Sequence, residues 1–355
     1  MIESIELHHF RGFEDLKVSG FARLNLIAGR NDVGKTALLE ALVLSNEPRL
    51  SGVFTALPLV RPAAIDPRAP TSLENWIWLF HGRNVHRDLS VRADRAEGAW
   101  SRLTLHVNAP EALQLARASG VPDSGRDALL RLHDASFTVT GEFWDGRLLQ
   151  CDVPLTLNGP RLPPDVPETG WNGSMVYAAG SVLGPELIAD WVGQLTAKRR
   201  IDALVEALRA VEPRLKRLFI AGENGVAVVK ADIGLGEAAP LGSLGGGFNR
   251  LACFLGQPLV YRKKLLVIDE IENGFHAFTL RDALQALRTV VREGDHQLFA
   301  TTHSQEALDA AAEVFDEADE FRLFRLEHGR TGQIRAVQLD RDQIRTALSL
   351  GWEIR

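Results

Sequence analysis

The sequence predicts an α/β protein whose core is a sheet of parallel or mixed strands. Three observations carry this prediction. An apolar run at 24–28 leads through a glycine-rich loop into a helical pattern that opens near Lys35. Apolar runs at 265–268 and 297–301 each end in polar residues and are followed by further helical patterns. Strands that alternate with helices along the chain usually form a parallel sheet with crossover helices.

The composition is that of a soluble globular protein with a substantial core. The chain has 355 residues, of which 45% are hydrophobic and 24% charged, enough for one large or two ordinary domains. The net charge of -6 argues against affinity of the whole protein for nucleic acid, although a local basic face stays open. Cys151 and Cys253 lack metal-type spacing, and we interpret them as idle thiols in a reducing compartment.

The N-terminus has no signal-peptide pattern, and no apolar run of about 18 residues occurs in the chain. We therefore expect a cytoplasmic protein that has no membrane role of its own.

Residues 1–85 are predicted to form the N-terminal part of the core. Apolar and polar side chains alternate over residues 1–9 with the period of a strand. The helix that opens near Lys35 should end at 45–48, where turn-forming residues occur. The pattern from 50 to 85 is irregular.

Residues 86–170 are predicted to form an inserted β-rich lobe. Short alternating stretches such as "SRLTLHV" and "ASFTVTGEFWDGRLLQCDV" indicate strands. Asp145 and Gly146 are the dipeptide that tight hairpin turns prefer. The segment "LNGPRLPPDVPETGWNG", with its prolines and glycines, predicts a loop after this lobe.

Residues 171–238 are predicted to form a helical lid with a hairpin. Helical periodicity extends over 183–218, and Asn224 and Gly225 predict a hairpin turn. Residues 239–355 then supply the C-terminal part of the core, ending with two strands and a closing helix near 341–350. We find no internal repeat.

The stretch "GRNDVGKT" fits the pattern G-x-x-x-x-G-K-[ST] of a phosphate-binding loop. Gly29, Asn31 and Gly34 would let backbone N–H groups point at phosphate oxygens. Lys35 would reach the outer phosphates, and the Thr36 hydroxyl would ligate Mg²⁺. Because an apolar strand precedes the motif and a helix follows it, we favour this reading over a chance glycine turn.

Two adjacent carboxylates follow the apolar run in "LLVIDEIENGFH". In a protein with a phosphate loop, an acid at the end of the neighbouring strand holds Mg²⁺ through water, and Asp269 fits this role. Glu270 is then the general base for a water that attacks the γ-phosphate. The stretch "HQLFATTHS" places His303 at the end of another strand, where it can hydrogen-bond the γ-phosphate or that water. The alternative is a pair of surface acids.

A second anion-binding surface is predicted at "LGSLGGGFNR". Consecutive glycines at the start of a helix expose backbone N–H groups to an anion, and Ser243, Gly245 and Gly247 are the candidate contacts. A flexible linker between lobes is the alternative.

The order of these motifs resembles the ATP-binding-cassette (ABC) class of ATPase heads. More narrowly, the chain is similar to stand-alone AAA ATPases of the overcoming-lysogenization-defect (OLD) family, with RecF, SMC and Rad50 heads as cousins. The opening "IELHHFRGFEDLKV" resembles that group's "nFRgf" start, which implies that Arg11 lies near the nucleotide. "IDEIENGFH" resembles its "IDEiEngLH" stretch, and "TTHS" matches it. The resemblance is strong at both ends of the chain and weak from about 50 to 215.

The resemblance implies that two heads sandwich two ATP molecules, each bound by the phosphate loop of one subunit and the glycine signature of the other. Glu270 would be the base, His303 the γ-phosphate sensor, and Asn273 and Gly274 would lie near the dimer seam. The chain departs from the family pattern in two places. The strict Leu-Ser-Gly-Gly-Gln signature is absent, so either Ser243 or Gly245 takes the serine's place. No glutamine stands out as the link between Mg²⁺ and the lid.

Full-length OLD-type proteins carry a Toprim nuclease domain after the ATPase, whereas only residues 304–355 follow His303 here. We therefore expect a lone head that regulates a separate effector, such as a Toprim-like nuclease, in a bacterial antiphage defence or toxin-type system. No sustained heptads lie between Lys35 and Asp269, which excludes a long coiled-coil arm.

Three other functions stay open at this point. A RecF-like DNA-binding clamp would use the basic stretches "AKRR", "RLKR" and "YRKK". A scaffold that binds ATP almost without turnover could cage a toxic partner. The motor of a membrane transporter is disfavoured by the β-rich insertion and the missing signature.

Overall fold

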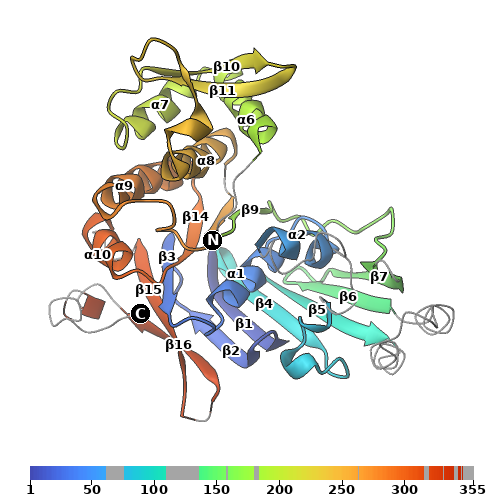
Figure 1. Ribbon diagram of the computed structural model, residues 1–355. Coiled ribbons are helices and arrows are strands. Elements are labelled where there is room, and N and C mark those ends of the chain that lie inside the picture. The colour runs from blue at the N-terminus through green and yellow to red at the C-terminus, as the bar shows by residue number, and fades with distance from the viewer. Residues whose placement is uncertain are drawn as a thin grey trace, which may run out of the picture. The chain divides into compact units, whose positions relative to one another are not determined.

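The computed structural model describes residues 1–60, 76–108, 136–156, 159–179, 184–262, 264–315, 320–330, 332–339, 343–344 and 346. The chain divides into two compact units, and Figure 1 shows their elements. Unit 1 comprises Met1–Phe21, Gly29–Val176 and Phe324–Gln338. Unit 2 comprises Ala22–Ala28, Tyr177–Leu323 and Leu339–Arg355. The division passes through strands β9 (Ser174–Tyr177) and β15 (Phe321–His328), and also through β16 (Ile334–Leu339).

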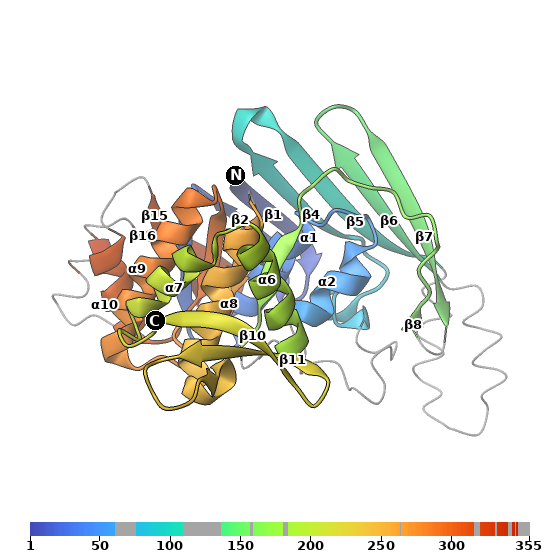
Figure 2. The ribbon, with the colours of Figure 1, turned by 90° about the horizontal axis from the view of Figure 1, so that it is seen from above.

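Unit 1 is built on a seven-stranded sheet in the order β2-β1-β4-β5-β6-β7-β8, whose neighbouring strands pair antiparallel (Figure 2). Its strands are β1 (Ile2–Phe10), β2 (Phe13–Ser19), β4 (Leu89–Arg95), β5 (Trp100–Asn108), β6 (Ser136–Phe143), β7 (Leu148–Thr156) and β8 (Gly159–Pro160). Burial alternates along β4, β5 and β6, because one face of each strand is apolar and the other polar. The strands predicted within 86–170 and the hairpin at Asp145 and Gly146 are present, but β1 and β2, which we predicted as part of the core, belong to the same sheet, so the bounds of an inserted lobe stay a prediction.

Two α-helices belong to unit 1, within the described ranges. Helix α1 (Lys35–Leu44) opens and ends where the sequence predicts, and its residues from Ala37 onward are all buried. Helix α2 (Gly52–Val60) lies in the segment that we predicted to be irregular. Its glycine start and Pro58 obscured the helical pattern, because both residues disfavour helix interiors. Two short 3₁₀ turns are also present: η2 (His81–Arg83) precedes β4, and η3 (Ala96–Gly98) connects β4 with β5.

The core of unit 2 contains three parallel strands in the order β3-β14-β13. They are β3 (Leu24–Gly29), β14 (Gln297–Thr301) and β13 (Leu265–Ile268), and every residue in them is buried. Such continuous burial explains why these runs are mostly apolar rather than alternating. The helices α8 (Gly246–Val260), α9 (Ala277–Glu293) and α10 (Gln305–Val314) lie beside them in Figure 1. The predicted order of strands and helices is confirmed here.

The lid region of unit 2 contains two helices and a hairpin (Figure 1). Its elements are α6 (Pro185–Ala197), α7 (Ile201–Arg209), β10 (Arg217–Glu223), β11 (Val226–Asp232), β12 (Ala239–Pro240) and the 3₁₀ turn η5 (Leu241–Leu244). The predicted turn at Asn224 and Gly225 is confirmed, with φ values of 50° and 82°. The predicted helical stretch 183–218 was too long, because β10 already begins at Arg217.

The closing helix predicted near 341–350 and the segment 61–75 lie largely or wholly outside the described residues. Within the described ranges, no helix is long and apolar enough to cross a membrane.

Candidate nucleotide-binding site

The phosphate loop in unit 1 depends on its two motif glycines. Gly29 has φ of 147° and Gly34 has φ of 97°, backbone conformations that L side chains rarely adopt. A Cβ at Gly29 would lie 2.7 Å from the carbonyl oxygen of Leu326, and one at Gly34 would lie 2.7 Å from Cζ of Phe13. Substitution at either position would therefore deform the loop.

Lys35 lies in the first turn of α1 and bonds to the loop itself. Its Nζ donates to the carbonyl oxygens of Gly29, at 2.6 Å, and Arg30, at 2.9 Å. Asn31 is exposed in the loop, and Thr36 is half-buried. The ammonium group is thus held against the loop whose N–H groups would bind phosphate.

Arg11 lies in the turn between β1 and β2 and is bound to α1. Its Nε and Nη2 each donate at 2.9 Å to a carboxylate oxygen of Glu40, which is fully buried. This bidentate pair attaches the "FRGF" turn to the helix that follows the phosphate loop. The predicted position of Arg11 near the nucleotide stays a prediction.

In unit 2, the hydroxyl of Thr301 contacts both predicted acids. It donates to Oδ1 of Asp269 at 2.5 Å and accepts the backbone N–H of Glu270 at 2.8 Å. Thr301 ends β14, and Asp269 directly follows the adjacent strand β13. Glu270 has a left-handed backbone with φ of 52°, which turns the chain away from the strand direction.

His303 contacts Glu272, an acid two residues after the predicted base Glu270. Oε1 of Glu272 accepts the backbone N–H of His303 at 3.0 Å and lies 3.2 Å from its ring Nδ1. About half of the His303 side chain is exposed, whereas that of Glu272 is only 12% exposed.

The glycine signature forms the start of α8, as predicted. Gly245, with φ of 103°, is the N-cap, and Gly247 lies in the first turn. A Cβ on Gly247 would lie 2.0 Å from the carbonyl oxygen of Gly274, so the two backbones touch. The hydroxyl of Ser243 donates to the carbonyl of Pro240 at 2.7 Å and is engaged within its own turn.

Arg250, one turn further along α8, is a buried cation beside the acids. Its Nη2 lies 3.4 Å from the carbonyl oxygens of both Asp269 and Glu270. Its Nε and Nη1 are buried and have no hydrogen-bond partner among the described residues. Burial lowers the pKa of Arg250, and the neighbouring acids, Glu270 foremost, raise it. The net effect is a lowered pKa, because burial outweighs the neighbouring carboxylates.

The structure assigns the predicted residues to two sets. Unit 1 holds the loop residues and Arg11; unit 2 brings together the two acids, His303 and the glycine signature. Sequence reasoning missed Thr301, Glu272 and Arg250. The signal for Thr301 and Glu272 was their place in the motifs "TTHS" and "IDEIENGFH", whereas nothing in the sequence singles out Arg250.

The donor atoms fit Mg²⁺, which prefers hard oxygen ligands and retains several waters. The hydroxyl of Thr36 and the carboxylate of Asp269 are such donors, and the contact with Thr301 fixes the orientation of that carboxylate. In the described part of the chain, no group of three or more His, Cys, Asp or Glu side chains could hold a metal without further ligands.

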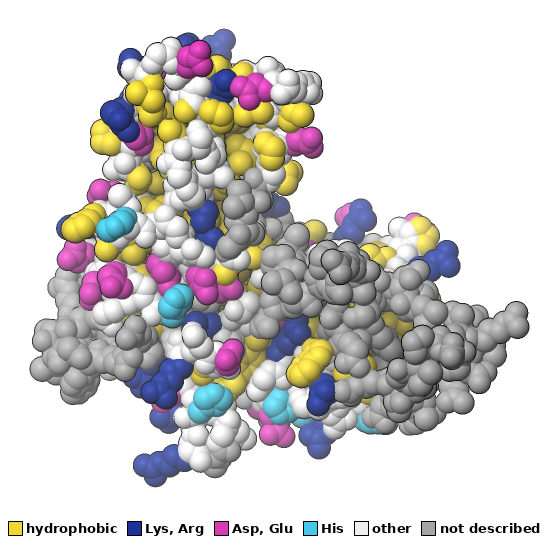
Figure 3. Space-filling model, viewed as in Figure 1, with side chains coloured by type: hydrophobic (Ala, Val, Ile, Leu, Met, Phe, Trp, Pro, Cys, Tyr) yellow, Lys and Arg dark blue, Asp and Glu magenta, His cyan; other side chains and the backbone are white. Residues whose placement is uncertain are grey.

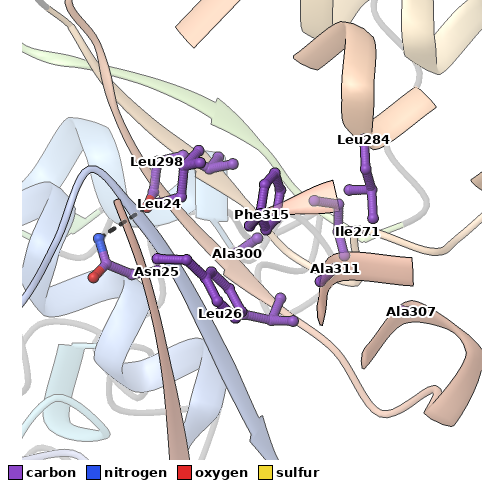
Figure 4. Close-up of a pocket in the computed structure, with 11 residues that line it drawn as sticks. Leu24, Asn25, Leu26, Ile271, Leu284, Leu298, Ala300, Ala307, Ala311 and Phe315 are labelled. Carbon is purple, nitrogen blue, oxygen red and sulfur yellow. Dashed lines mark hydrogen bonds between the residues drawn. The ribbon is translucent and has the colours of Figure 1, made fainter. Parts of the chain in front are cut away.

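A small pocket in unit 2 does not suit a nucleotide. It lies between β3, β14, α9 and α10, and apolar side chains such as Leu26, Ile271 and Phe315 line it (Figure 4). The one polar residue in its lining, Asn25, bonds to the carbonyl of Leu298. Because a triphosphate would find no polar partners there, we interpret the pocket as a packing defect of the core.

Comparison with solved structures identifies the architecture. An Smc head domain derived from Pyrococcus furiosus, with an extended coiled coil and bound to the C-terminal domain of ScpA, superposes with a TM-score of 0.51. The identity is 12%, and the alignment covers 98% of each chain. The fold is that of an ABC-type ATPase head. The α/β class and the head-like fold predicted from the sequence are thereby confirmed.

Sequence comparisons agree with an ATPase head. Residues 178–309 match a family model described as "AAA domain, putative AbiEii toxin, Type IV TA system", and residues 4–45 match an "AAA domain". An "ATP/GTP phosphatase" of Helicobacter pylori is 21% identical over 344 residues, which are 90% of each chain. RecF of Idiomarina loihiensis is 46% identical over 43 residues, 12% of each chain. These matches support an ATP-hydrolysing P-loop ATPase of the AAA and SMC-head type.

Proposed function

We propose that this protein binds ATP with Mg²⁺ and hydrolyses it. One observation carries the proposal. The backbone N–H of Thr302 donates to the carbonyl of Ile27 at 3.0 Å, so the end of β14 lies beside the end of β3. The phosphate loop begins at Gly29, two residues later, and parallel strands place their ligands at this edge of the sheet.

Each residue has a role in this proposal. The loop and Lys35 bind the phosphates, and Thr36 and Asp269 hold the magnesium ion, which neutralises charge on the outer phosphates. Glu270 accepts a proton from the attacking water, and His303 contacts the γ-phosphate. Thr301 keeps Asp269 and Glu270 in fixed orientations.

The test of the base is Glu270→Gln. The amide has nearly the same shape but cannot accept the proton, so we expect ATP binding to persist and turnover to fall by about 100-fold or more. Glu306→Gln, an exposed acid on the following helix, is the matched control and should leave turnover unchanged. Unchanged phosphate release from Glu270→Gln would remove the assignment of the base.

We propose further that ATP drives two heads together and that the closed dimer regulates a separate effector in the cytoplasm, as in OLD-type defence systems. The Smc head named above is a complex with ScpA, which supports partner binding by this fold. Light scattering of Glu270→Gln with and without ATP tests the dimer, and a mass that does not change refutes it. If the heads assemble only with ATP but the wild-type protein shows almost no turnover, a scaffold that cages a toxic partner is supported instead.

A DNA clamp is the second candidate, and the local match with RecF favours it. On the face shown in Figure 3, however, Lys and Arg side chains are scattered among acidic and apolar ones. ATP-dependent binding of duplex DNA that weakens steeply with salt would support the clamp.

A further inference from the structure

The contact between Glu272 and His303 determines which ring nitrogen of the imidazole is available to a ligand. One oxygen, Oε1, accepts the backbone N–H of His303 at 3.0 Å and lies 3.2 Å from Nδ1 of the same residue. This distance is within ion-pair range, and an unprotonated Nδ1 would place its lone pair against the carboxylate oxygen, so the ring proton on this side is expected on Nδ1. The neutral ring then has its lone pair on Nε2.

We propose that Glu272 is a positioning residue that fixes the Nδ1–H tautomer of His303 and leaves Nε2 as the atom that meets the nucleotide or its water. This inference rests on the role of His303 in the proposed function. It adds a carboxylate that acts only through the imidazole, in the way that a buried acid orients a catalytic histidine.

The burial of Glu272 argues against a merely incidental contact. Its side chain is 12% exposed, and its second oxygen, Oε2, is buried with no hydrogen-bond partner among the described residues. A buried carboxylate oxygen of this kind is costly unless a counter-charge lies near. Arg250 supplies that charge, since Glu272 is among the acids that raise its pKa.

The tautomer can be measured without ATP. In ¹⁵N-labelled protein, at a pH where the ring is neutral, we expect the His303 signals to show a protonated Nδ1 and an unprotonated Nε2. His303→Gln identifies these signals among those of the ten histidines. In Glu272→Ala the proton should shift toward Nε2. A protonated Nε2 in the wild type would overturn the inference, as would His303 ring signals that are the same in Glu272→Ala and in the wild type.

Turnover provides the second readout. We expect Glu272→Ala to lower kcat by about 10- to 100-fold with little change in KM, the range seen when the partner of a functional histidine is lost. Glu272→Gln keeps an acceptor oxygen and should retain most of the activity. Glu306→Ala, which removes the exposed acid bonded to the Ser304 hydroxyl in the same segment, is the control.

A double variant separates positioning from structural damage. If Glu272 acts through His303, Glu272→Ala should cost nothing further in a His303→Ala background, whereas two independent effects would multiply. Multiplied effects would overturn the inference. A wild-type protein that does not hydrolyse ATP would defeat the proposed function, while the ring signals would still decide the pairing.

Discussion

At the residue scale, Thr301 is the side chain that connects the two acids. Its hydroxyl donates to Asp269 and accepts from the N–H of Glu270, and it is fully buried. Two bonds through one oxygen tie the carboxylate of Asp269 to the backbone of Glu270. The neighbouring Thr302 is equally buried, but among the described residues its hydroxyl bonds only to the backbone of Ser304.

This difference predicts opposite outcomes for two similar substitutions. Thr301→Val should lower ATP turnover by about tenfold or more, since about 1.4 kcal/mol of lost transition-state stabilisation is tenfold in rate. Thr302→Val should fold with a comparable loss of stability and keep its turnover. Steady-state phosphate release and thermal melts of both variants check this, and equal turnover in the two would contradict the role of Thr301.

His296 predicts a pH dependence of stability. It is fully buried, with Nδ1 3.1 Å from the backbone N–H of Lys264 and Nε2 3.1 Å from the carbonyl of Pro258. Burial lowers its pKa from the ordinary value of 6.5. The unfolded chain therefore takes up a proton at a higher pH than the folded chain does. The contribution of neutral His296 to the free energy of unfolding is complete above pH 6.5. It is lost as the pH falls from 6.5 toward the lower pKa of the folded state.

The measurement compares denaturant melts of wild type and His296→Gln between pH 7.5 and pH 5. The wild type should lose more stability across this window than the variant, whose side chain does not titrate. Parallel curves would show that other groups dominate the acid response.

At the element scale, the start of α8 is fitted to the loop that carries Gly274. Gly247 has no room for a Cβ, whereas a Cβ on the adjacent Gly246 would meet nothing within 4 Å. We predict that Gly247→Ala destabilises the protein by about 1–3 kcal/mol, as overpacking does. Gly246→Ala should be neutral or stabilise by up to about 1 kcal/mol, because alanine favours helix. Melting curves of the two variants decide, and equal melting temperatures would contradict the contact.

The elements that could be predicted from the sequence are those with strong local patterns. β3, β13 and β14 are continuous apolar runs, and the turns at Gly146 and Gly225 follow from their dipeptides. α2 could not be predicted, because proline and glycine hide its period. Arg250 could not be recognised either, since its importance lies in contacts with residues far away in sequence.

At the scale of the whole molecule, the candidate site residues are divided between two compact units, each built from several separate segments of the chain. The phosphate loop belongs to unit 1 and the acids to unit 2, while β3 passes from one to the other at Gly29. Under the proposed function, we expect neither unit to hydrolyse ATP alone.

The most exposed large apolar side chain in the described part of the chain is Phe278, which is 87% exposed in the first turn of α9. Its ring stacks on His276, 5.7 Å between centroids, and it follows the Gly274 loop expected near the dimer seam. We predict that Phe278→Ser weakens ATP-dependent dimerisation of Glu270→Gln heads. Losing a buried phenylalanine costs about 1.5–3 kcal/mol, or about 10- to 100-fold in association.

The control is Leu148→Ser, which removes another exposed apolar side chain, on β7 of unit 1. Sedimentation at graded protein concentrations with ATP gives both association constants. Dimers of equal strength would place the seam away from α9.

The carbonyl contacts of Lys35 have a consequence for affinity. A phosphate oxygen that binds this ammonium competes with the carbonyl oxygens of Gly29 and Arg30, which already lie within hydrogen-bond distance of Nζ. Where a phosphate oxygen takes the place of a carbonyl oxygen, Lys35 contributes to the binding free energy only the difference between the two bonds.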